Sequence, residues 1–308
     1  MSAINKKTPH PIYVIGSINT DMVVKTDSLP QPGQTVLGGE FIMTAGGKGA
    51  NQAVAASRLG GNVSMVGCVG LDVFGDEALT KLKSEKISCD FVSRDQATPS
   101  GVALISVDGA GENHIVVAPG ANNCLEEQSV AAALIAAPPT SMILAQLETP
   151  LATVAHTLLL AKEKGCKVVL DPAPAQELPQ KFFQDLYLIT PNETEAEILT
   201  GIKVDGEETA LAAAKVLLAR GALNVAITMG KNGVLLANTS KSEIFLAPQT
   251  SALDTTAAGD CFNGAVAAAL AQGNTLAYAV DFGCQCASIS VTRMGAQESL
   301  PTLNEVSP

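Results

Sequence analysis

Short apolar runs that alternate with longer amphipathic segments are the feature that most constrains the fold of this chain. The apolar runs lie at residues 11–16, 62–70, 141–148, 166–174, 185–192 and 223–230. Helical periodicity is found over residues 49–60, 75–85, 150–165, 193–201, 207–221, 259–272 and 275–292. Continuously apolar strands separated by helices are typical of a parallel sheet buried on both faces. We therefore expect a three-layer α/β fold with helices on each side of a mainly parallel central sheet.

Two stretches interrupt this rhythm, residues 17–45 and 99–119. Both contain short β-like segments with glycine-rich turns, and neither contains a helical pattern. Such insertions are expected to pair into a small β-sheet lid over the main part of the fold. Because the sequence has no internal repeat and no low-complexity linker, residues 1–308 are expected to form a single domain that carries this lid.

The composition argues against several classes of function. The net charge is −11 and there is no cluster of Lys and Arg, so a nucleic-acid-binding protein is not expected. Three histidines are too few for a His-rich metal site, and no Gly-x-Ser-x-Gly motif is present. Seven cysteines without a Cys-x-x-Cys pair fit free thiols in a reducing compartment. The polar N-terminus and the short apolar runs predict neither a signal peptide nor a membrane span, so a cytoplasmic protein is expected.

Polar residues follow the ends of several expected strands. In open parallel sheets, ligands bind beyond the carboxyl ends of the strands. The residues at these positions are Asn19, Asp21, Glu148, Asp171, Asn192, Glu195, the turn 228–233 and the segment 254–260. We expect them to converge on one site.

The most informative of these segments is LDTTAAGDCFNGAVAAAL, residues 253–270. A helix that begins near Ala258 leaves four amides without partners inside the helix, those of Ala257, Ala258, Gly259 and Asp260. Free amides at the positive end of a helix dipole form an anion site that suits a phosphoryl group. The Asp260 carboxylate would accept a proton from the attacking hydroxyl, and the alternative is that it only complements the dipole. The dipole is expected to lower the pKa of Asp260, which phosphoryl transfer tolerates.

Three further motifs allow a structural and a functional interpretation. The stretch GGKGAN (46–51) does not fit the P-loop frame GxxxxGK[ST], so it is either a tight turn or a close approach of the backbone to a small ligand. Asn19 and Asp21 either form an Asx turn or bind sugar hydroxyls. Glu148 either complements a helix dipole or points into the cleft.

Two motifs in the second half of the chain also have two interpretations. Asn192 and Glu195 have the spacing of a capping box, and the same pair could hold a hydrated Mg²⁺ near nucleotide phosphates. The turn TMGKNG (228–233) either begins a hairpin or contacts a nucleotide.

Together, the motifs GSINTD, GGKGANQA, QLE, TPNETEAE, DTTAAGD and TRMGAQ resemble those of the ribokinase-like (PfkB-type) carbohydrate kinases over nearly the whole chain. The family signature DTxGAGD differs here only at Ala257. The resemblance implies a three-layer fold with a small β lid, and a homodimer in which two lids clasp each other. It also implies phosphorylation of D-ribose at O5 by ATP, with Mg²⁺ and an activating K⁺ as cofactors.

The resemblance also assigns a role to each matching residue. Asp260 would be the catalytic base, and Ala257, Ala258 and Gly259 would complete the anion hole. Ribose would be held by Asn19, Asp21, Gly47, Lys48, Asn51 and Glu148. ATP would contact Asn192, Thr228, Met229, Gly230, Lys231, Asn232, Gly233, Gly259 and Cys284. The K⁺ site would comprise Asp254, Thr256, Ser290, Arg293, Gly295 and Ser299, and Mg²⁺ would be positioned through water by Asn192 and Glu195.

The residues near the expected sugar site favour an unphosphorylated substrate. A phosphosugar would require extra Arg near Asn19 or Gly47, and none is present. An adenosine-type substrate would require stacking aromatics, for which Phe41 and Phe91 are the candidates. A 2-deoxyribose kinase remains the closest alternative, followed by kinases of other sugars or nucleosides. A non-catalytic sugar sensor on the same fold is disfavoured by the intact Asp260.

Overall fold

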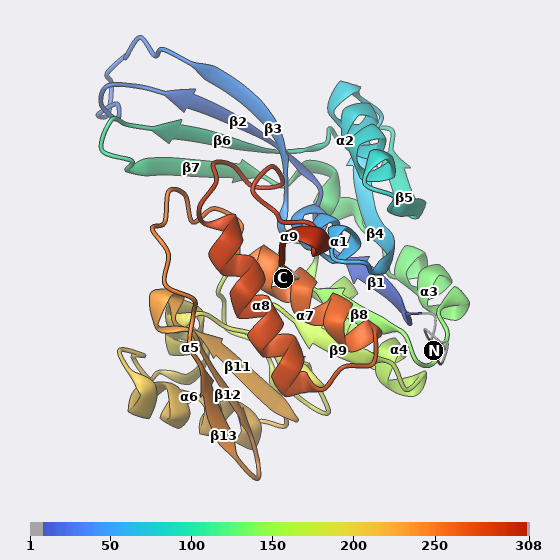
Figure 1. Cartoon of the computed structure of the whole chain (residues 1–308). Helices are drawn as coiled ribbons and strands as arrows, with labels where there is room; N and C mark the ends of the chain where they lie inside the picture. The colour runs from blue at the N-terminus through green and yellow to red at the C-terminus, as the bar shows by residue number, and fades with distance from the viewer. Residues whose placement is uncertain (1–8, 307–308) are drawn as a thin grey trace, which may run out of the picture.

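The computed structural model describes residues 9–306 and is built around a nine-stranded sheet with the order β13-β12-β11-β10-β9-β8-β1-β4-β5 (Figure 1). All neighbours from β11 to β5 are parallel, and β12 and β13 are added antiparallel. The strands are β1 (Pro11–Ile15), β4 (Asn62–Gly70), β5 (Ser88–Asp95), β8 (Met142–Ala145), β9 (Lys167–Leu170), β10 (Leu188–Ile189), β11 (Asn224–Thr228), β12 (Val234–Asn238) and β13 (Ser242–Phe245). The mainly parallel sheet expected from the sequence is confirmed. Residues 1–8 of the polar N-terminus lie outside the described residues.

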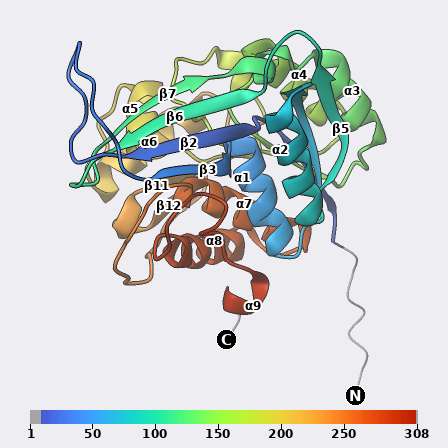
Figure 2. The ribbon, with the colours of Figure 1, turned by 90° about the horizontal axis from the view of Figure 1, so that it is seen from above.

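Helices cover both faces of this sheet (Figures 1 and 2). One face carries α1 (Lys48–Arg58), α2 (Val73–Ser84), α7 (Ala258–Ala271) and α8 (Leu276–Ser290). The other carries α3 (Glu127–Ala136), α4 (Leu151–Glu163), α5 (Glu193–Thr200) and α6 (Glu207–Ala219). Short helical turns are η1 (Gly120–Cys124), η2 (Gln180–Phe182), η3 (Gly230–Asn232) and α9 (Leu303–Val306). Because successive strand residues point to opposite faces, Val14 packs into one core and Ile15 into the other.

Small residues allow α1 and α7 to pack closely. Almost every residue of α7 from Asp260 onward is buried, and the helix is rich in alanine. A Cβ atom added at Gly264 of α7 would lie 2.5 Å from the Cβ atom of Ala55 in α1. The close contact brings the N-terminal ends of both helices to the carboxyl edge of the parallel strands.

A second, four-stranded sheet has the order β3-β2-β6-β7 and stands over the N-terminal end of α1 (Figures 1 and 2). Its strands are β2 (Asn19–Lys25), β3 (Phe41–Gly46), β6 (Gly101–Val107) and β7 (Asn113–Ala118). The pairs β2–β3 and β6–β7 are antiparallel, and the central pair β2–β6 is parallel. We call these four strands the small sheet.

The boundaries of several elements differ from the sequence-based expectation. The apolar run 185–192 forms only the two-residue strand β10, and Asp185 at the start of this run is left-handed, with φ of 60°. Strands β5, β12 and β13 and helix α3 were not predicted. β5 and β13 lie at the two edges of the sheet and carry many polar residues, which hides their strand pattern. In the described part of the chain, no helix is long and apolar enough to span a membrane.

Candidate active site

Helix α7 begins with its N-terminal amides facing a pocket. Ala257 is the residue before the first turn and is left-handed, with φ of 58° and ψ of 15°. This conformation costs a residue with a Cβ atom about 1 kcal/mol relative to glycine. The amides of Ala257, Gly259 and Asp260 have no protein acceptor among the described residues, whereas that of Ala258 donates to the carbonyl of Thr255 at 3.2 Å. The sequence-based expectation of four free amides is therefore wrong by one, because the chain closes a turn before the helix starts.

Asp260 is buried at the first turn of α7, with 5% of its surface exposed. Its carboxylate accepts hydrogen bonds from Asn51 Nδ2 at 2.9 Å and from Gln52 Nε2 at 3.0 Å. Burial raises the pKa of Asp260 above its ordinary value, and this outweighs the opposing effects of Lys48, Asn51 and Gln52. The expected lowering of this pKa by the helix dipole is wrong, because desolvation of the carboxylate is the larger effect.

A buried amide relay holds the Asp260 carboxylate and was not recognised in the sequence. Gln146 Nε2 donates to Gln52 Oε1 at 2.6 Å, which turns Gln52 Nε2 toward both Asp260 and Asp171. The distance from Gln52 Nε2 to Asp171 Oδ2 is 2.7 Å. Gln52 follows directly after GGKGAN, and Gln146 directly after a strand, so their positions alone could have marked them as candidates.

The pocket in front of α7 has a volume of about 200 Å³ and contains one lysine. Burial opposes protonation of Lys48, but Asp260, Asp171, Glu148 and Glu195 together raise its pKa. Lys48 therefore remains a cation beside the free amides of α7. The other residues of the pocket wall are Asp171, Ala173, Thr190, Asn192, Glu195, Thr228, Thr255, Ala257, Ala258, Gly259, Asp260 and Asn263.

The glycines of GGKGAN permit close packing between α1 and the first turn after β1. Gly47 has φ of 87°, and a Cβ atom there would lie 2.7 Å from the amide nitrogen of Asn19. A Cβ atom at Gly49 would lie 2.6 Å from the amide nitrogen of Ser17. Glu148 Oε2 accepts from Ser17 Oγ at 2.5 Å and from the Lys48 amide at 3.2 Å. Glu148 thus complements the N-terminus of α1, a helix distant from it in the sequence.

Asn19 and Asp21 lie on β2 of the small sheet and reach the same region. Asn19 Oδ1 accepts from Asn122 Nδ2 at 2.7 Å. Burial, together with the charges of Glu148, Asp260 and Glu298, raises the pKa of Asp21 to about 6. A Cβ atom at Gly46 would lie 2.2 Å from the Asp21 carboxylate, so a larger residue there would displace that carboxylate. The structure therefore brings Asp21, Asn51 and Glu148 close to Asp260, and Gly47 lies between Asn51 and Asn19.

Asn192 and Glu195 form the capping box expected from their spacing, at the start of α5. Asn192 Oδ1 accepts from the Glu195 amide at 2.9 Å, and Glu195 Oε2 accepts from the Asn192 amide at 2.8 Å. Burial raises the pKa of Glu195. Both residues face the pocket, so the capping and ligand-binding interpretations are compatible.

The turn 228–233 connects β11 and β12 as a hairpin, and only Thr228 of this turn lines the pocket. Met229 is buried, and η3 (Gly230, Lys231, Asn232) is solvent-exposed before Gly233. Cys284 is a residue of α8 that points into the core, where burial raises the pKa of its thiol to about 12. The thiol does not line the pocket.

The residues of the expected K⁺ site lie on two neighbouring segments. The amides of Leu253 and Asp254 donate to the carbonyl of Val291, at 2.7 and 3.2 Å. Asp254 Oδ2 accepts from the Gly295 amide at 2.8 Å, and Oδ1 accepts from the Thr256 amide at 2.9 Å. The pKa of Asp254 lies below its ordinary value. Partial burial alone would raise this pKa, but the hydrogen bonds from Thr256 and Gly295 have the larger combined effect.

Three remaining residues of that expected site are also near these segments. Ser290 Oγ donates to Ala287 O, and Ser299 Oγ donates to Ala296 O at 2.7 Å. The Arg293 guanidinium instead pairs with Glu305 at 2.5 Å. Arg293 can therefore contribute to a cation site only through its main chain.

Comparison with known proteins places this geometry in a family. The model of the pfkB family of carbohydrate kinases matches residues 10–303. A ribokinase of Haemophilus influenzae is 43% identical over 294 residues, covering 96% of each chain. A deoxyribokinase of Salmonella typhi is 37% identical over 295 residues, again covering 96% of each. The structure of an Arabidopsis thaliana ribokinase complexed with ribose and ATP superimposes with a TM-score of 0.88 at 28% identity, covering 97% of this chain and 98% of that one.

Proposed function

The chain belongs to the pfkB family of carbohydrate kinases, and on this basis we propose that it transfers the γ-phosphoryl group of ATP to O5 of D-ribose. The products are D-ribose 5-phosphate and ADP. The observation that carries the proposal is the buried Asp260 carboxylate beside three free amides at the start of α7. This arrangement offers a proton acceptor and an anion site within one turn of helix.

The proposed step needs little covalent chemistry from the protein. Asp260 accepts the proton of the ribose O5 hydroxyl while O5 forms a bond to the γ-phosphorus. The bond from the γ-phosphorus to the bridging oxygen breaks, and its electron pair leaves with ADP. Because its pKa is raised, Asp260 is a better proton acceptor than a carboxylate whose pKa is lowered by a helix dipole.

The positive charge near the transferred group comes from main-chain amides and one lysine. The free amides of Ala257, Gly259 and Asp260 point into the pocket from the positive end of the α7 dipole. A Cβ atom at Gly259 would meet no atom within 4 Å, so the space beside its Cα atom is open, and Gly259 lines the pocket. We assign Lys48 to the phosphates rather than to ribose alone, because its side chain lines the same pocket.

Asn19, Asp21, Gly47, Asn51 and Glu148 are proposed to hold ribose. They offer amide and carboxylate groups, which match the hydroxyl groups of a neutral sugar. Asn51 Oδ1 is buried and has no partner among the described residues, so it is free to accept a sugar hydroxyl. The sugar would then approach Asp260 from the side of the small sheet.

The nucleotide is proposed to extend from the α7 pocket past Thr228 toward residues 229–233. Asn192 and Glu195 fit a hydrated Mg²⁺, because the capping box leaves Glu195 Oε1 free and uses only one lone pair of Asn192 Oδ1. Magnesium bound with ATP would supply positive charge to the β- and γ-phosphates. No cluster of three His, Cys, Asp or Glu that could hold a metal occurs within residues 9–306, so phosphates and water would complete the coordination.

The two segments joined at Asp254 fit an activating K⁺. They offer one ionised carboxylate, the hydroxyls of Thr256, Ser290 and Ser299, and the main-chain oxygens of residues 293–295. Hard oxygen ligands of this kind suit an alkali cation. The ion would hold the segment before α7 in place and thereby keep the free amides aligned.

The small sheet is proposed to be a lid and a dimer surface. Asp21 and Thr44 lie opposite each other and face the site, so the alternating residues Met22, Met43, Leu104 and Val116 share the other face. Met43, Leu104 and Val116 are exposed, at 45%, 52% and 66%. An apolar sheet face of this kind favours pairing with a second copy. We propose that the enzyme acts in the cytoplasm, where its seven free thiols are stable.

A kinase of 2-deoxyribose is the second candidate, because a similar relative carries the name deoxyribokinase. The test is to measure ADP formation with ribose, 2-deoxyribose, fructose and adenosine, and to locate the phosphate by ³¹P NMR. We expect the highest kcat/KM with ribose and a phosphomonoester at C5. A higher kcat/KM with 2-deoxyribose would support the second candidate, and ribose binding without ADP formation would indicate a sensor.

A further inference from the structure

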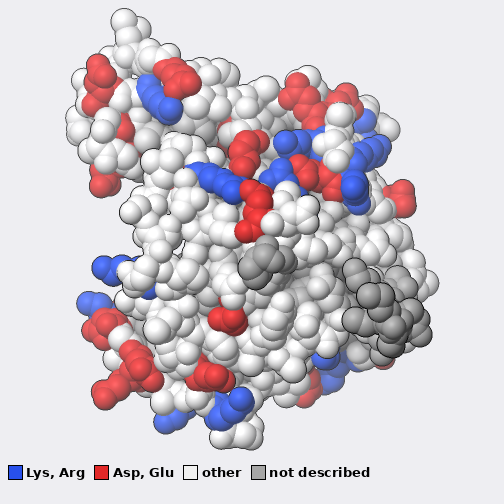
Figure 3. All heavy atoms as spheres, viewed as in Figure 1, with Lys and Arg blue, Asp and Glu red and all other residues white. Residues whose placement is uncertain are grey.

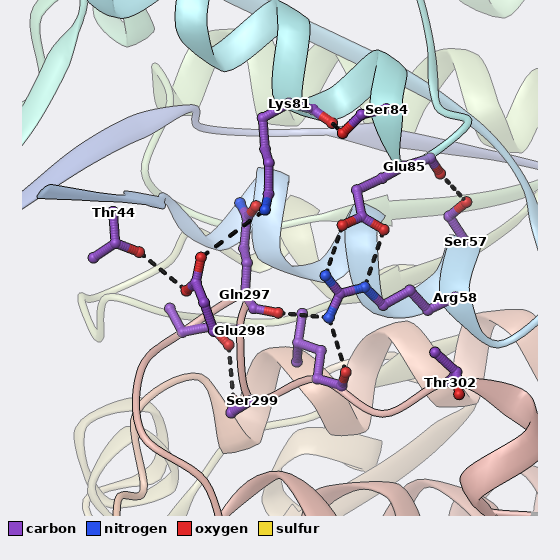
Figure 4. A network of polar contacts seen from close by, with 12 residues as sticks. Thr44, Ser57, Arg58, Lys81, Ser84, Glu85, Gln297, Glu298, Ser299 and Thr302 are labelled. Carbon is purple, nitrogen blue, oxygen red and sulfur yellow. Dashed lines mark hydrogen bonds and ion pairs between the residues drawn. The ribbon is translucent and has the colours of Figure 1, made fainter.

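Residues 293–300, which we call the C-terminal loop, contact both the small sheet and the segment before α7. Figure 4 shows the contact with the small sheet. Thr44 Oγ1 of β3 donates to Glu298 Oε2 at 3.1 Å. Three residues earlier in the loop, the Gly295 amide donates to Asp254 Oδ2 at 2.8 Å. The loop therefore spans the distance between the proposed lid and the proposed phosphate site.

Thr44 connects the Glu298 contact directly to the sugar-binding face. It pairs with Asp21 across the β2–β3 ladder, so the two side chains share one face of the small sheet. The Glu298 charge contributes to the raised pKa of Asp21, which indicates that the two carboxylates lie close together. A movement of the Asp21 face is therefore transmitted to Thr44 and then to Glu298.

The backbone on both sides of Glu298 is fixed to the main body. Arg58 Nη1 of α1 donates to the carbonyls of Gln297 at 2.6 Å and Leu300 at 2.9 Å. The Arg58 guanidinium is held by a two-point ion pair with Glu85, at 2.6 and 3.0 Å. These anchors fix the position from which the Glu298 side chain reaches Thr44.

The Thr44 hydrogen bond is the shorter of the two side-chain contacts of Glu298 among the described residues. Its other partner, Lys81 of α2, lies 4.0 Å away and both side chains are well exposed, a geometry that contributes little. Figure 3 shows basic and acidic side chains interspersed where the small sheet, α2 and the C-terminal region meet. Both contacts are exposed, and the Thr44 bond, at 3.1 Å, is within hydrogen-bond distance whereas the Lys81 contact is at the limit of an ion pair.

We infer that Glu298 is a positioning residue that couples the small sheet to the anion site through the Thr44 bond. The inference rests on the proposed function and deepens it. When ribose orders the small sheet, Thr44 fixes Glu298, and the C-terminal loop then holds Asp254 through Gly295. Asp254 in turn accepts from Thr256, the residue before the free amide of Ala257. Ribose and the nucleotide phosphates thereby favour each other's binding.

The test measures this coupling without requiring turnover. Calorimetry gives the Kd for ribose with and without Mg–ADP in the wild type, Glu298→Ala, Thr44→Val and the double variant. We expect ADP to tighten ribose binding by about fivefold in the wild type, the lower end of usual coupling between sites. The ratio should fall toward one in both single variants and no further in the double variant. Glu298→Gln, which keeps a neutral acceptor, should lie between.

Two control variants separate this bond from general charge effects. Lys81→Met removes the neighbouring cation and leaves the Thr44 bond in place. Glu243→Gln removes an exposed acid on β13, which is an edge strand of the nine-stranded sheet and not part of the small sheet that carries Thr44. Both should keep the wild-type ratio, and thermal unfolding should show that all variants are folded. An unchanged ratio in Glu298→Ala, losses that multiply in the double variant, or an equal loss in Lys81→Met would each overturn the inference.

Hydrogen exchange of the amides of residues 41–46 distinguishes a failure of this inference from a failure of the proposed function. We expect Mg–ADP alone to slow exchange in β3 of the wild type but not in Glu298→Ala. Equal slowing in both proteins, or slowing in neither, would overturn the coupling. If the wild type failed to bind ribose, the proposed function would be wrong, and the exchange measurement would still decide whether the nucleotide site and the small sheet are linked.

Discussion

Replacement of Asp260 by asparagine tests the proposed base with little change in shape. Removal of a positioned general base lowers turnover by about 10²- to 10⁴-fold. At about 1.4 kcal/mol per tenfold, this corresponds to about 3–5 kcal/mol of transition-state stabilisation. ADP formation with saturating ribose and ATP, followed in a coupled assay, gives kcat directly.

The hydrogen bonds around residue 260 indicate that this variant will fold. Its amide oxygen can keep the bond from Gln52 Nε2, and its amide nitrogen then faces Asn51. Asn51 Oδ1 has no partner in the described structure, so rotation of that amide supplies an acceptor. The number of satisfied hydrogen bonds is therefore preserved.

The pH dependence of stability gives an independent check on the same variant. Because the pKa of Asp260 is raised, the folded protein binds this proton more tightly than the unfolded chain does. The free energy of unfolding therefore falls as pH rises above the ordinary carboxyl pKa of 3.8, until the folded pKa is passed. Asp260→Asn lacks this loss, so at neutral pH it should be at least as stable as the wild type, and its advantage should vanish as pH falls toward 4.

Asp171→Asn is the matched control, since Asp171 shares the Gln52 donor but does not lie at the start of α7. We expect it to lose about tenfold in kcat or less. If Asp260→Asn kept a rate within tenfold of the wild type, or if both variants lost the same activity, Asp260 would not be the base.

Three further outcomes follow from the site and the small sheet. The kcat/KM for ribose should rise as pH rises through about 6, because Asp21 then ionises and becomes an acceptor for sugar hydroxyls. If the pH profile of Asp21→Asn showed the same inflection, this prediction would be wrong. Gln52→Leu should lower both kcat and stability, because it removes the partner of Gln146 Nε2 and the Gln52 bonds to Asp171 and Asp260, while Asp260 keeps its bond from Asn51. The loss of stability should be about 1–3 kcal/mol in chemical denaturation, and unchanged stability would contradict the relay. Leu104→Glu on the small sheet should convert a dimer to a monomer in analytical ultracentrifugation, whereas Leu159→Glu on α4, equally exposed, should remain a dimer.

The arrangement of strands and the location of the site could be predicted from local patterns. Continuous apolar runs separated by helices specify parallel strands, and parallel strands end at the same edge of a sheet. For this reason Asn192, Glu148 and Asp260, which are far apart in the sequence, could be expected at one cleft before any contact was known. The capping box at Asn192 was also predictable, because its bonds lie within one helical turn.

The details that set the chemistry depend on contacts between distant segments, which local patterns do not encode. The pKa of Asp260 follows from its burial between α1 and α7, and its partners Gln52 and Gln146 lie about 100 to 200 residues away in the chain. The bond between Thr44 and Glu298, 254 residues apart, likewise appears only once the chain has folded. Periodicity records which face of an element is apolar, whereas desolvation and hydrogen bonding depend on which neighbours the fold then places against that face.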